Sequence, residues 1–268
     1  MPQNDIRHIL GLSGGKDSAA LALYLKDKVE KIEYFFCDTH KELPETYEFL
    51  HKLEARLGKK IHYLENKRGF DHWLDVNRGF LPSPSNRWCT KQLKIKPIEK
   101  FIGLDTAYSY IAIRADENRA GYIPTKPNIK PVFPFHDEKP GITKKDVIKI
   151  LEESGVGLPK YYKWRSRSGC FFCFFQRKIE WVRLHENHPD LFNEAVEYEK
   201  SHEDGRRYYW SEGESLLDLI ERKDKILAGY EKSQRIRKGD LPNTPLIELL
   251  KPILDDDDDE EFCFACNL

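Results

Sequence analysis

The sequence lacks the features that mark membrane, secreted and low-complexity proteins. Its longest run of consecutive apolar residues is seven, Ala19 to Leu25, whereas a helix that spans a bilayer needs roughly 20. The N-terminus, MPQNDIRHIL, has no apolar stretch of the kind found in signal peptides. With 16 glycines and 15 prolines in 268 residues, the chain is neither collagen-like nor of low complexity. We therefore expect a soluble, cytoplasmic protein with no membrane partner.

An excess of charge of one sign is also absent, but the two signs are unevenly placed. The chain has 44 basic and 45 acidic residues, a net charge of −1. Seven of the acids form one block, residues 255–261; subtracting these seven from 45 leaves 38 against the 44 basic residues, so the body carries about +6. The block is followed by FCFACNL at the C-terminus. We expect a basic body with an acidic, cysteine-bearing tail.

Short β-branched or aromatic runs alternate with helical patterns in the first 158 residues, which is typical of a parallel α/β sheet. The runs predict strands at residues 6–12, 31–37, 61–64, 108–113 and, with two prolines that favour a sheet edge, 130–135. The patterns between them predict helices at 18–30, 44–57 and, after an N-cap at Thr143, up to 153. Later helices are predicted near 177–185, 189–201, 214–237 and 245–254. The sequence thus predicts an α/β domain at 1–158, a cysteine-containing loop and helical part at 159–254, and the tail at 255–268.

A glycine-rich loop, SGGKDS at residues 13–18, lies between the first predicted strand and the first predicted helix. Backbone N–H groups and a helix N-terminus at such a place favour a bound phosphate. The two glycines let the backbone approach the anion closely, and Lys16 can meet its charge. A Walker A loop would need glycine at position 10 and Ser or Thr at 17, where this chain has Leu10 and Asp17. The sequence therefore predicts a phosphate loop of another kind.

The SGGKDS string resembles the fingerprint of the PP-loop ATP pyrophosphatases. Further segments narrow the resemblance to the phosphoadenosine phosphosulfate (PAPS) reductase branch, which also includes ATP sulfurylases and nucleic-acid thiolation enzymes. These segments are Asp38-Thr39 followed by LPETYEF at 43–49, RADENR at 114–119, and the proline-containing residues 131–135 with the helix after them. The resemblance covers roughly residues 6–185.

The resemblance implies a fold and a reaction. The fold is a doubly wound parallel sheet, Rossmann-like and of the adenine nucleotide alpha hydrolase type, with a helical C-terminal extension. The reaction is cleavage of ATP, with Mg²⁺, between its α and β phosphates, so positive charge should lie where the pyrophosphate leaves. The residues that would bind the nucleotide are Ser13, Gly14, Gly15, Lys16, Asp17, Ser18, Asp38 and Thr39. Those that would take part in catalysis are Lys16, Asp17, Asp38, Arg114 and Arg119.

Three positions qualify the resemblance. Lys16 favours ATP as the substrate, because sulfonucleotide reductases generally carry a different residue there. Asp38 is a candidate for steering the metal, or else an aspartate that caps a helix or closes a turn. His40 stands where the family often has glycine, which makes the local backbone geometry a point of interest.

Cysteines at paired spacing in a cytoplasmic protein indicate metal or redox sites rather than structural disulfides. Cys170 and Cys173 form one CxxC pair, and Cys263 and Cys266 form another. The segment RWCTK around Cys89 resembles an element that, with a distant CxxC, binds a [4Fe–4S] cluster in the branch, although Thr90 replaces its second cysteine.

The resemblance therefore implies Cys89, Cys170 and Cys173 as cluster ligands, with one iron open or with Cys263 or Cys266 as the fourth ligand. A zinc ion held by the two pairs is the alternative, although 89 residues separate them, far beyond zinc-ribbon spacing. Free thiols or a redox pair are a further alternative. Cys37, at the end of an apolar strand, is interpreted as a buried core cysteine.

Two segments interleave basic and aromatic residues, KYYKWRSR at 160–167 and RRYYW at 206–210. This composition suits phosphates and exposed bases of a nucleic acid, tRNA or DNA. It is equally typical of a small core with a solvated basic rim.

The leading hypothesis is an ATP-dependent enzyme that adenylylates an acceptor and acts in sulfur transfer with an iron–sulfur centre. Its acceptor is a nucleic acid or another molecule, and a sulfur-donor protein is its partner. A sulfonucleotide reductase, in which the C-terminal Cys266 attacks adenylyl sulfate, is the first alternative. A non-catalytic nucleotide-binding partner with a zinc site is the second.

Overall fold

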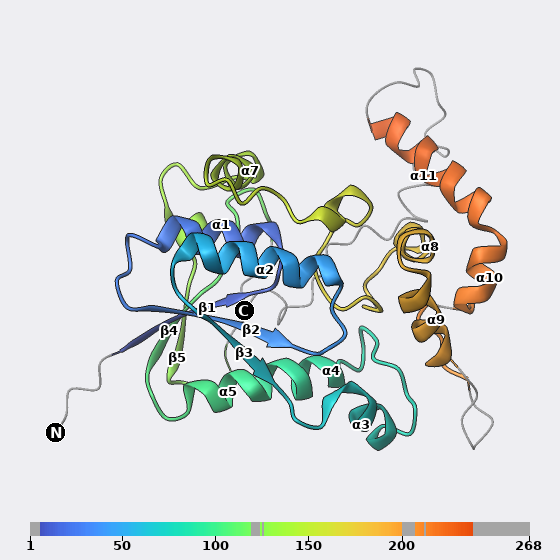
Figure 1. Ribbon diagram of the computed structural model, residues 1–268, viewed down its shortest axis with the longest axis horizontal. Helices are drawn as coiled ribbons and strands as arrows, with labels where there is room; N and C mark the ends of the chain where they lie inside the picture. Colours follow the sequence, from blue (N-terminus) through green and yellow to red (C-terminus); the bar gives the residue numbers. More distant parts are fainter. Residues whose placement is uncertain (1–5, 119–123, 125, 200–206, 212, 238–268) are drawn as a thin grey trace. The chain divides into compact units, whose positions relative to one another are not determined.

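Figure 1 shows the computed structural model, which describes residues 6–118, 124, 126–199, 207–211 and 213–237. These residues form two compact units. The first holds the described residues up to Trp73 and Arg87–Cys170, and the second holds Leu74–Asn86 and the described residues from Phe171 onward. Arg119, the helix predicted at 245–254 and the tail with Cys263 and Cys266 lie outside the described residues. The predicted domain boundaries stay a prediction.

A five-stranded parallel sheet forms the centre of the first unit, with the strand order β3-β2-β1-β4-β5. The strands are β1 (Arg7–Leu12), β2 (Ile32–Asp38), β3 (Ile61–Glu65), β4 (Ala107–Tyr110) and β5 (Ile129–Val132). The chain runs outward from β1 to β3 and then returns to the other side of β1, which makes the sheet doubly wound. This order confirms the predicted α/β fold class. The point where it reverses lies beside the carboxyl end of β1, where ligands bind in such sheets.

Helices cover both faces of this sheet, and the alternation of side chains along each strand decides what each face meets. Leu10, Leu12, Tyr34 and Phe36 pack in one cluster with residues of α1, α2 and α7. Ile9, Phe35 and Cys37 pack in another with residues of α5. Figure 1 shows α1, α2 and α7 on one side of the sheet and α5 on the other. The helices of this unit are α1 (Lys16–Leu25), α2 (Pro44–Leu57), α4 (Trp88–Thr90), a π-helical turn (Lys91–Ile95), α5 (Lys96–Ile102), α6 (Pro134–Asp137) and α7 (Lys144–Glu153), while α3 (Gly69–Val76) runs across the boundary between units.

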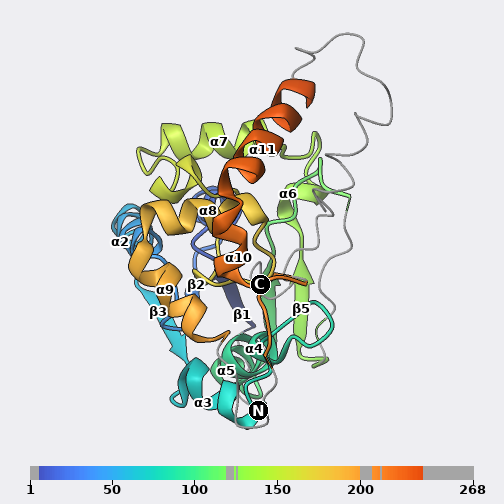
Figure 2. The same cartoon turned by 90° about the vertical axis from the view of Figure 1, so that its right-hand side faces the viewer.

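The second unit is helical, as the sequence predicts for the C-terminal part. It contains α8 (Lys178–Asn187), α9 (Pro189–Glu197), α10 (Leu216–Glu221) and α11 (Lys223–Arg237). Helices α9, α10 and α11 all pack against α8 (Figure 2). The single helix predicted at 214–237 is wrong: Ser215 begins α10 as an N-cap with a capping box to Asp218, and α10 ends before α11 begins. Phe172 stacks on Trp210 with ring centroids 4.9 Å apart, which places these aromatic residues in the interior of the unit.

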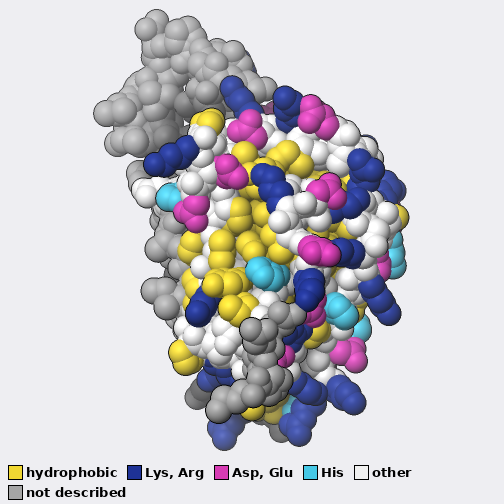
Figure 3. Space-filling model, turned by 90° about the vertical axis from the view of Figure 1, so that its left-hand side faces the viewer, with side chains coloured by type: hydrophobic (Ala, Val, Ile, Leu, Met, Phe, Trp, Pro, Cys, Tyr) yellow, Lys and Arg dark blue, Asp and Glu magenta, His cyan; other side chains and the backbone are white. Residues whose placement is uncertain are grey.

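None of the described helices is long and apolar enough to cross a membrane. On the face drawn in Figure 3, apolar side chains gather at the centre with lysine, arginine and acidic side chains around them. The charge of this face is therefore mixed.

Candidate functional site

The glycine-rich loop lies between β1 and α1, at the point where the strand order reverses. Gly14 has a φ of +72°, a backbone conformation that residues other than glycine rarely adopt. An added Cβ at this position would lie 2.5 Å from Thr46 Cγ2. A Cβ on Gly15 would lie 2.9 Å from Ser168 Oγ. The loop therefore needs both glycines, one for its backbone conformation and both for the close approach of neighbouring side chains.

The two serines of the loop hold its shape. The backbone N–H of Ser13 donates to Ser18 Oγ at 3.1 Å, and the two hydroxyl oxygens are 3.1 Å apart. Ser18 Oγ also donates to the Gly15 carbonyl at 3.4 Å. These bonds close the loop against the first turn of α1, so that the backbone which would contact a phosphate is fixed before any ligand binds.

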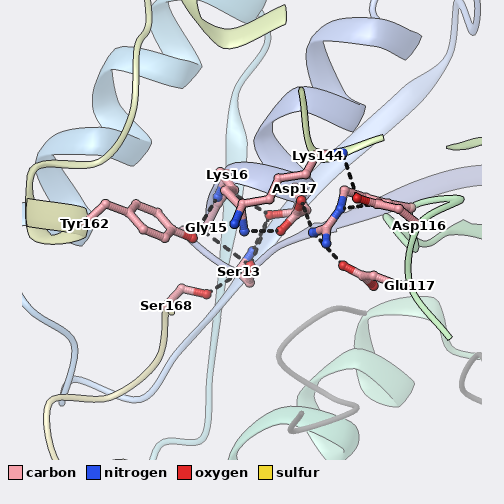
Figure 4. Close-up of polar contacts among 12 residues, drawn as sticks. Ser13, Gly15, Lys16, Asp17, Asp116, Glu117, Lys144, Tyr162 and Ser168 are labelled. Atoms are coloured by element: carbon pink, nitrogen blue, oxygen red, sulfur yellow. Dashed lines mark hydrogen bonds and ion pairs between the residues drawn. The ribbon is translucent and has the colours of Figure 1, made fainter. Parts of the chain in front are cut away.

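Three charged residues, Lys16, Asp17 and Arg114, meet at this loop (Figure 4). Asp17 bridges the two cations: its Oδ2 is 2.8 Å from Lys16 Nζ and its Oδ1 is 2.8 Å from Arg114 Nη1. Arg114 also binds Asp116, through Nε at 2.9 Å, and Glu117. The structure thus brings together three of the predicted catalytic residues, and it adds Asp116 and Glu117 as carboxylates that hold the guanidinium.

Both cations keep their charge despite their burial. Burial by itself lowers the pKa of Lys16, but the neighbouring Tyr162 and Asp17 outweigh it, and the pKa is raised. Burial acts in the same direction on Arg114, and Asp17 and Glu117 overcome it, so the pKa of Arg114 is raised as well. With side chains that are only 15% and 11% exposed, the two residues place positive charge in a partly desolvated site, where it acts strongly on an anion.

Residues far along the chain reach the same loop. Tyr161 donates its hydroxyl to the Gly14 carbonyl at 2.8 Å, and the N–H of Lys16 donates to the hydroxyl of Tyr162 at 3.4 Å. Ser168 Oγ donates to Ser13 Oγ at 3.3 Å. We call residues 160–170 the docking segment. The sequence left residues 160–167 open between a surface for bases and a small core with a basic rim, and it did not predict these contacts.

Burial changes the interpretation of the docking segment. Tyr161 is fully buried, Trp164 is 8% exposed and Arg165 is 2% exposed. The Arg165 guanidinium donates to the carbonyls of Gly169 and Cys170, at 3.1 Å and 2.9 Å. These three residues belong to the interior and offer no surface on which exposed bases could stack.

Asp38 ends β2 and is held by its neighbours. Its Oδ1 accepts from the hydroxyl of Tyr47 at 2.7 Å and from the N–H of His40 at 2.8 Å, and the second bond is an Asx turn. Asp38 therefore closes a turn, as one of its two interpretations predicted, while α2 takes its N-cap from Leu43. His40, which stands where the family often has glycine, has a φ of 58°, in the left-handed region that favours glycine.

Thr39 contacts a thiol rather than the glycine loop in the described contacts. Its hydroxyl donates to Glu42 Oε1 at 2.9 Å and lies 3.2 Å from Cys170 Sγ, which is 3.5 Å from the same carboxylate oxygen. Burial raises the pKa of Glu42. The docking segment therefore brings Cys170 to the carboxyl end of β2, next to a buried carboxyl group that sequence reasoning missed.

The other predicted metal ligands are dispersed over several elements. Cys89 lies in α4, and Cys173 falls in the second unit, whereas Cys170 falls in the first. Within the part of the chain that the structure describes, no three His, Cys, Asp or Glu side chains form a group that could hold a metal ion. Cys37 is buried in the sheet, as predicted, and burial raises its pKa to about 12.

Comparisons with known proteins show what this chain is similar to. Residues 7–127 match the model of the phosphoadenosine phosphosulfate reductase domain family. Two proteins of Methanocaldococcus jannaschii, described only as uncharacterized, are 26% identical over 82% of this chain and 31% identical over 72% of it. The tRNA-specific 2-thiouridylase of Sulfurimonas denitrificans is 27% identical over 72% of this chain. The chain spans 55%, 42% and 59% of the lengths of these three relatives.

A solved structure is also similar. The phosphoadenylyl-sulfate reductase of Candida auris, determined in complex with phosphate, is 14% identical to this chain. The match covers 62% of this chain and 82% of the other, with a TM-score of 0.48.

Proposed function

Because this chain belongs to the phosphoadenosine phosphosulfate reductase domain family, within the PP-loop superfamily of adenine nucleotide alpha hydrolases, we propose that it is an ATP-dependent adenylylating enzyme. In this proposal it cleaves ATP between the α and β phosphates and acts in sulfur transfer, with a nucleic acid as the acceptor. The similarity to a tRNA-specific 2-thiouridylase supports the choice of acceptor.

One observation carries the proposal: two desolvated cations, Lys16 and Arg114, flank a glycine loop at a helix N-terminus. Loop amides and the N-terminus of α1 favour phosphate oxygens. A carboxylate, Asp17, fixes both cations before the ligand arrives, so that little reorganisation is needed when charge develops. This arrangement is suited to binding a triphosphate and to stabilising its leaving group.

The chemistry proceeds by displacement at the α phosphorus. An oxygen of the acceptor forms a bond to that phosphorus, while the bond to the oxygen bridging the α and β phosphates breaks and its electron pair leaves with pyrophosphate. Lys16 and the loop amides stabilise the charge that builds up on this leaving group. Arg114 holds the α phosphate, and the acceptor's proton passes to solvent. Mg²⁺ would supply further charge stabilisation, with Asp38 as the residue suited to hold it.

The experiment is pyrophosphate release from ATP by the full chain, with no acceptor, with total tRNA and with DNA. We expect Lys16→Ala to lower the rate by at least about 100-fold, because a single group that stabilises transition-state charge has effects of this size. Lys52→Ala, which removes an exposed lysine of α2, is the matched control and should leave the rate unchanged. If the protein binds ATP and Lys16→Ala changes neither its affinity nor pyrophosphate release, the proposal is wrong.

A sulfonucleotide reductase is the second candidate, favoured by the family whose model matches residues 7–127. In that reaction a thiolate attacks the sulfur of adenylyl sulfate, the nucleotide leaves, and a second thiol later releases sulfite from the sulfur-bound intermediate. Sulfite formation from adenylyl sulfate that is lost in Cys266→Ser would favour this function over adenylylation.

The sulfur-transfer part of the proposal involves the thiols of Cys89, Cys170 and Cys173, as ligands of an iron–sulfur cluster or as thiols that act without a metal. No step of the adenylylation depends on a metal cluster. Anaerobic purification followed by iron, acid-labile sulfide and zinc analysis distinguishes the alternatives. Stoichiometric zinc without iron would exclude the cluster.

A further inference from the structure

The docking segment contacts the glycine-rich loop at three residues, from a position roughly 150 residues away in the sequence. Tyr161 donates to the Gly14 carbonyl, Tyr162 accepts from the N–H of Lys16, and Ser168 Oγ donates to Ser13 Oγ. Figure 4 shows the hydroxyls of Tyr162 and Ser168 pointing toward the loop from the same side. The glycine-rich loop, to which the proposed function assigns phosphate binding, is therefore faced by two hydroxyl groups.

The contacts of Tyr161 and Tyr162 differ in kind. The Tyr161 hydroxyl is buried and donates to a carbonyl, so its single proton is used. The Tyr162 hydroxyl accepts from the Lys16 N–H at 3.4 Å and is also hydrogen-bonded to the Tyr161 side chain. Burial raises the pKa of Tyr161, and this hydrogen bond contributes to the rise. The ammonium of Lys16 lies 5.4 Å from the centroid of the Tyr162 ring. Tyr162 thus places a hydroxyl oxygen next to the first backbone amide of α1 and beside a cation.

A phosphate oxygen could bind between that hydroxyl and the Lys16 amide. The 3.4 Å separation between the Lys16 nitrogen and the Tyr162 oxygen is at the long end for a hydrogen bond. An opening of about 1 Å would let one phosphate oxygen accept from both groups at normal hydrogen-bond distances. Ser168 stands next to Ser13, with a hydroxyl that can turn from Ser13 Oγ toward the same anion.

We propose that Tyr162 and Ser168 are phosphate-binding residues that complete the nucleotide site from outside the glycine-rich loop. The inference rests on the proposed function and names further groups that contact its substrate. Each hydroxyl donates to an oxygen of the triphosphate, and Tyr162 exchanges its bond with the Lys16 amide for this one. Hydrogen bonds to a charged group are stronger than those between neutral groups, which favours the exchange.

The test measures the affinities of ATP and of pyrophosphate by calorimetry, with Mg²⁺, for the full chain and its variants. Tyr162→Phe removes one hydroxyl and keeps the ring, and we expect it to weaken both ligands about 10-fold, as the loss of a hydrogen bond to a charged group does. Ser168→Ala should weaken both ligands a few-fold. Ser166→Ala, which removes an exposed hydroxyl of the same segment, is the matched control and should change neither affinity.

The urea midpoint of the ligand-free protein separates binding from structure. Tyr161→Phe leaves a buried carbonyl without its donor and should lower this midpoint, whereas Tyr162→Phe should leave it nearly unchanged. If Tyr162→Phe lowers the midpoint as much as Tyr161→Phe does, its role is structural and the inference is wrong.

The affinities decide the remaining outcomes. Unchanged affinities in Tyr162→Phe and Ser168→Ala overturn the inference and leave the proposed function standing, as does a loss for ATP without a loss for pyrophosphate. If the wild-type protein binds neither ligand, both proposals are wrong. If binding depends on Tyr162 but no pyrophosphate is released from ATP under any condition, the inference stands and adenylylation is wrong.

Discussion

Replacing Gly14 by alanine tests whether the glycine-rich loop is held by the contacts described above. The new side chain meets two obstacles. A φ of +72° costs a residue other than glycine about 1–2 kcal/mol. Its Cβ would also lie 2.5 Å from Thr46 Cγ2, where a normal contact between carbon atoms is about 3.5–4.0 Å.

The loop has little freedom to relieve this clash. The hydroxyl of Tyr161 holds the Gly14 carbonyl by a hydrogen bond, and Thr46 is fully buried. Forcing an extra carbon into a packed site costs about 1–3 kcal/mol. Together with the backbone term, we expect Gly14→Ala to lower the free energy of unfolding by about 2–5 kcal/mol.

Urea unfolding of the full chain, followed by circular dichroism, measures this loss, and the chain offers a matched control. Gly58 has a φ of +66° but no atom within 4 Å of its added Cβ, so Gly58→Ala should cost only the backbone term of about 1–2 kcal/mol. Thr46→Ser removes the methyl group that the new Cβ would meet. In a double-mutant cycle this change should recover about 1–3 kcal/mol of the cost of Gly14→Ala. Equal costs for Gly14→Ala and Gly58→Ala, or no recovery in the double variant, would refute the reasoning.

Three further predictions concern charge and backbone strain. Asp17→Ala leaves the two cations that it bridges without this partner and should cost about 1–3 kcal/mol in urea unfolding at pH 7. The hydrogen bond from Arg7 lowers the pKa of Glu33, so this pair stabilises the fold above the carboxyl's unfolded pKa and loses its effect as the pH falls through the folded pKa. Glu33→Gln should therefore cost up to about 1 kcal/mol at pH 7 and less at pH 3, and an equal cost at both would contradict the linkage. His40→Gly relieves the strain of a φ of 58°, and Arg78→Gly relieves that of a φ of 52°. In thermal unfolding each change should raise the free energy of unfolding by up to about 1 kcal/mol. A loss in both would show that positive φ is not strained here.

The sequence predicted the sheet well because its signals are local. Each strand is a short run of β-branched and aromatic residues, and burial on both faces makes the run continuously apolar. In β2 the alternate residues Tyr34 and Phe36 face one set of helices, and Phe35 and Cys37 face the other. The helix predicted at 44–57 has the observed bounds, with a proline in its first turn and Gly58 in the left-handed conformation at its end.

The region between β3 and β4 was missed because its local signals conflict. Residues 88–102 form three short helical pieces, with a π-helical turn in the middle and Pro97 in the first turn of α5. Basic residues interrupt the apolar pattern, so no stretch is long enough to show a helical period. The helix forms because its apolar residues, among them Ile98 and Ile102, complete the core on the second face of the sheet.

The sequence left the docking segment open between a nucleic-acid surface and a small core for a related reason. Basic and aromatic residues in alternation have the composition of a nucleic-acid surface, but burial depends on what the segment packs against. Arg165 is buried because the chain turns back on itself and offers it the carbonyls of Gly169 and Cys170. These carbonyls lie only four and five residues after Arg165 in the sequence, but they can accept its hydrogen bonds only because the chain turns at this point.

The candidate site contains residues at the ends of strands and residues of the docking segment, and the sequence predicts only the first group. In a parallel sheet with the order β2-β1-β4, the carboxyl ends of these strands are neighbours, so the residues that follow them must meet. The glycine-rich loop follows β1, Arg114 follows β4 and Asp38 ends β2, so the strand order and the motifs predict that they lie at one edge of the sheet. The docking segment follows no strand of the sheet, and no argument from strand order can bring Tyr162 or Ser168 to the loop. Their placement depends on contacts between side chains that are roughly 150 residues apart in the sequence. For this reason only the structure shows that these two residues face the glycine-rich loop.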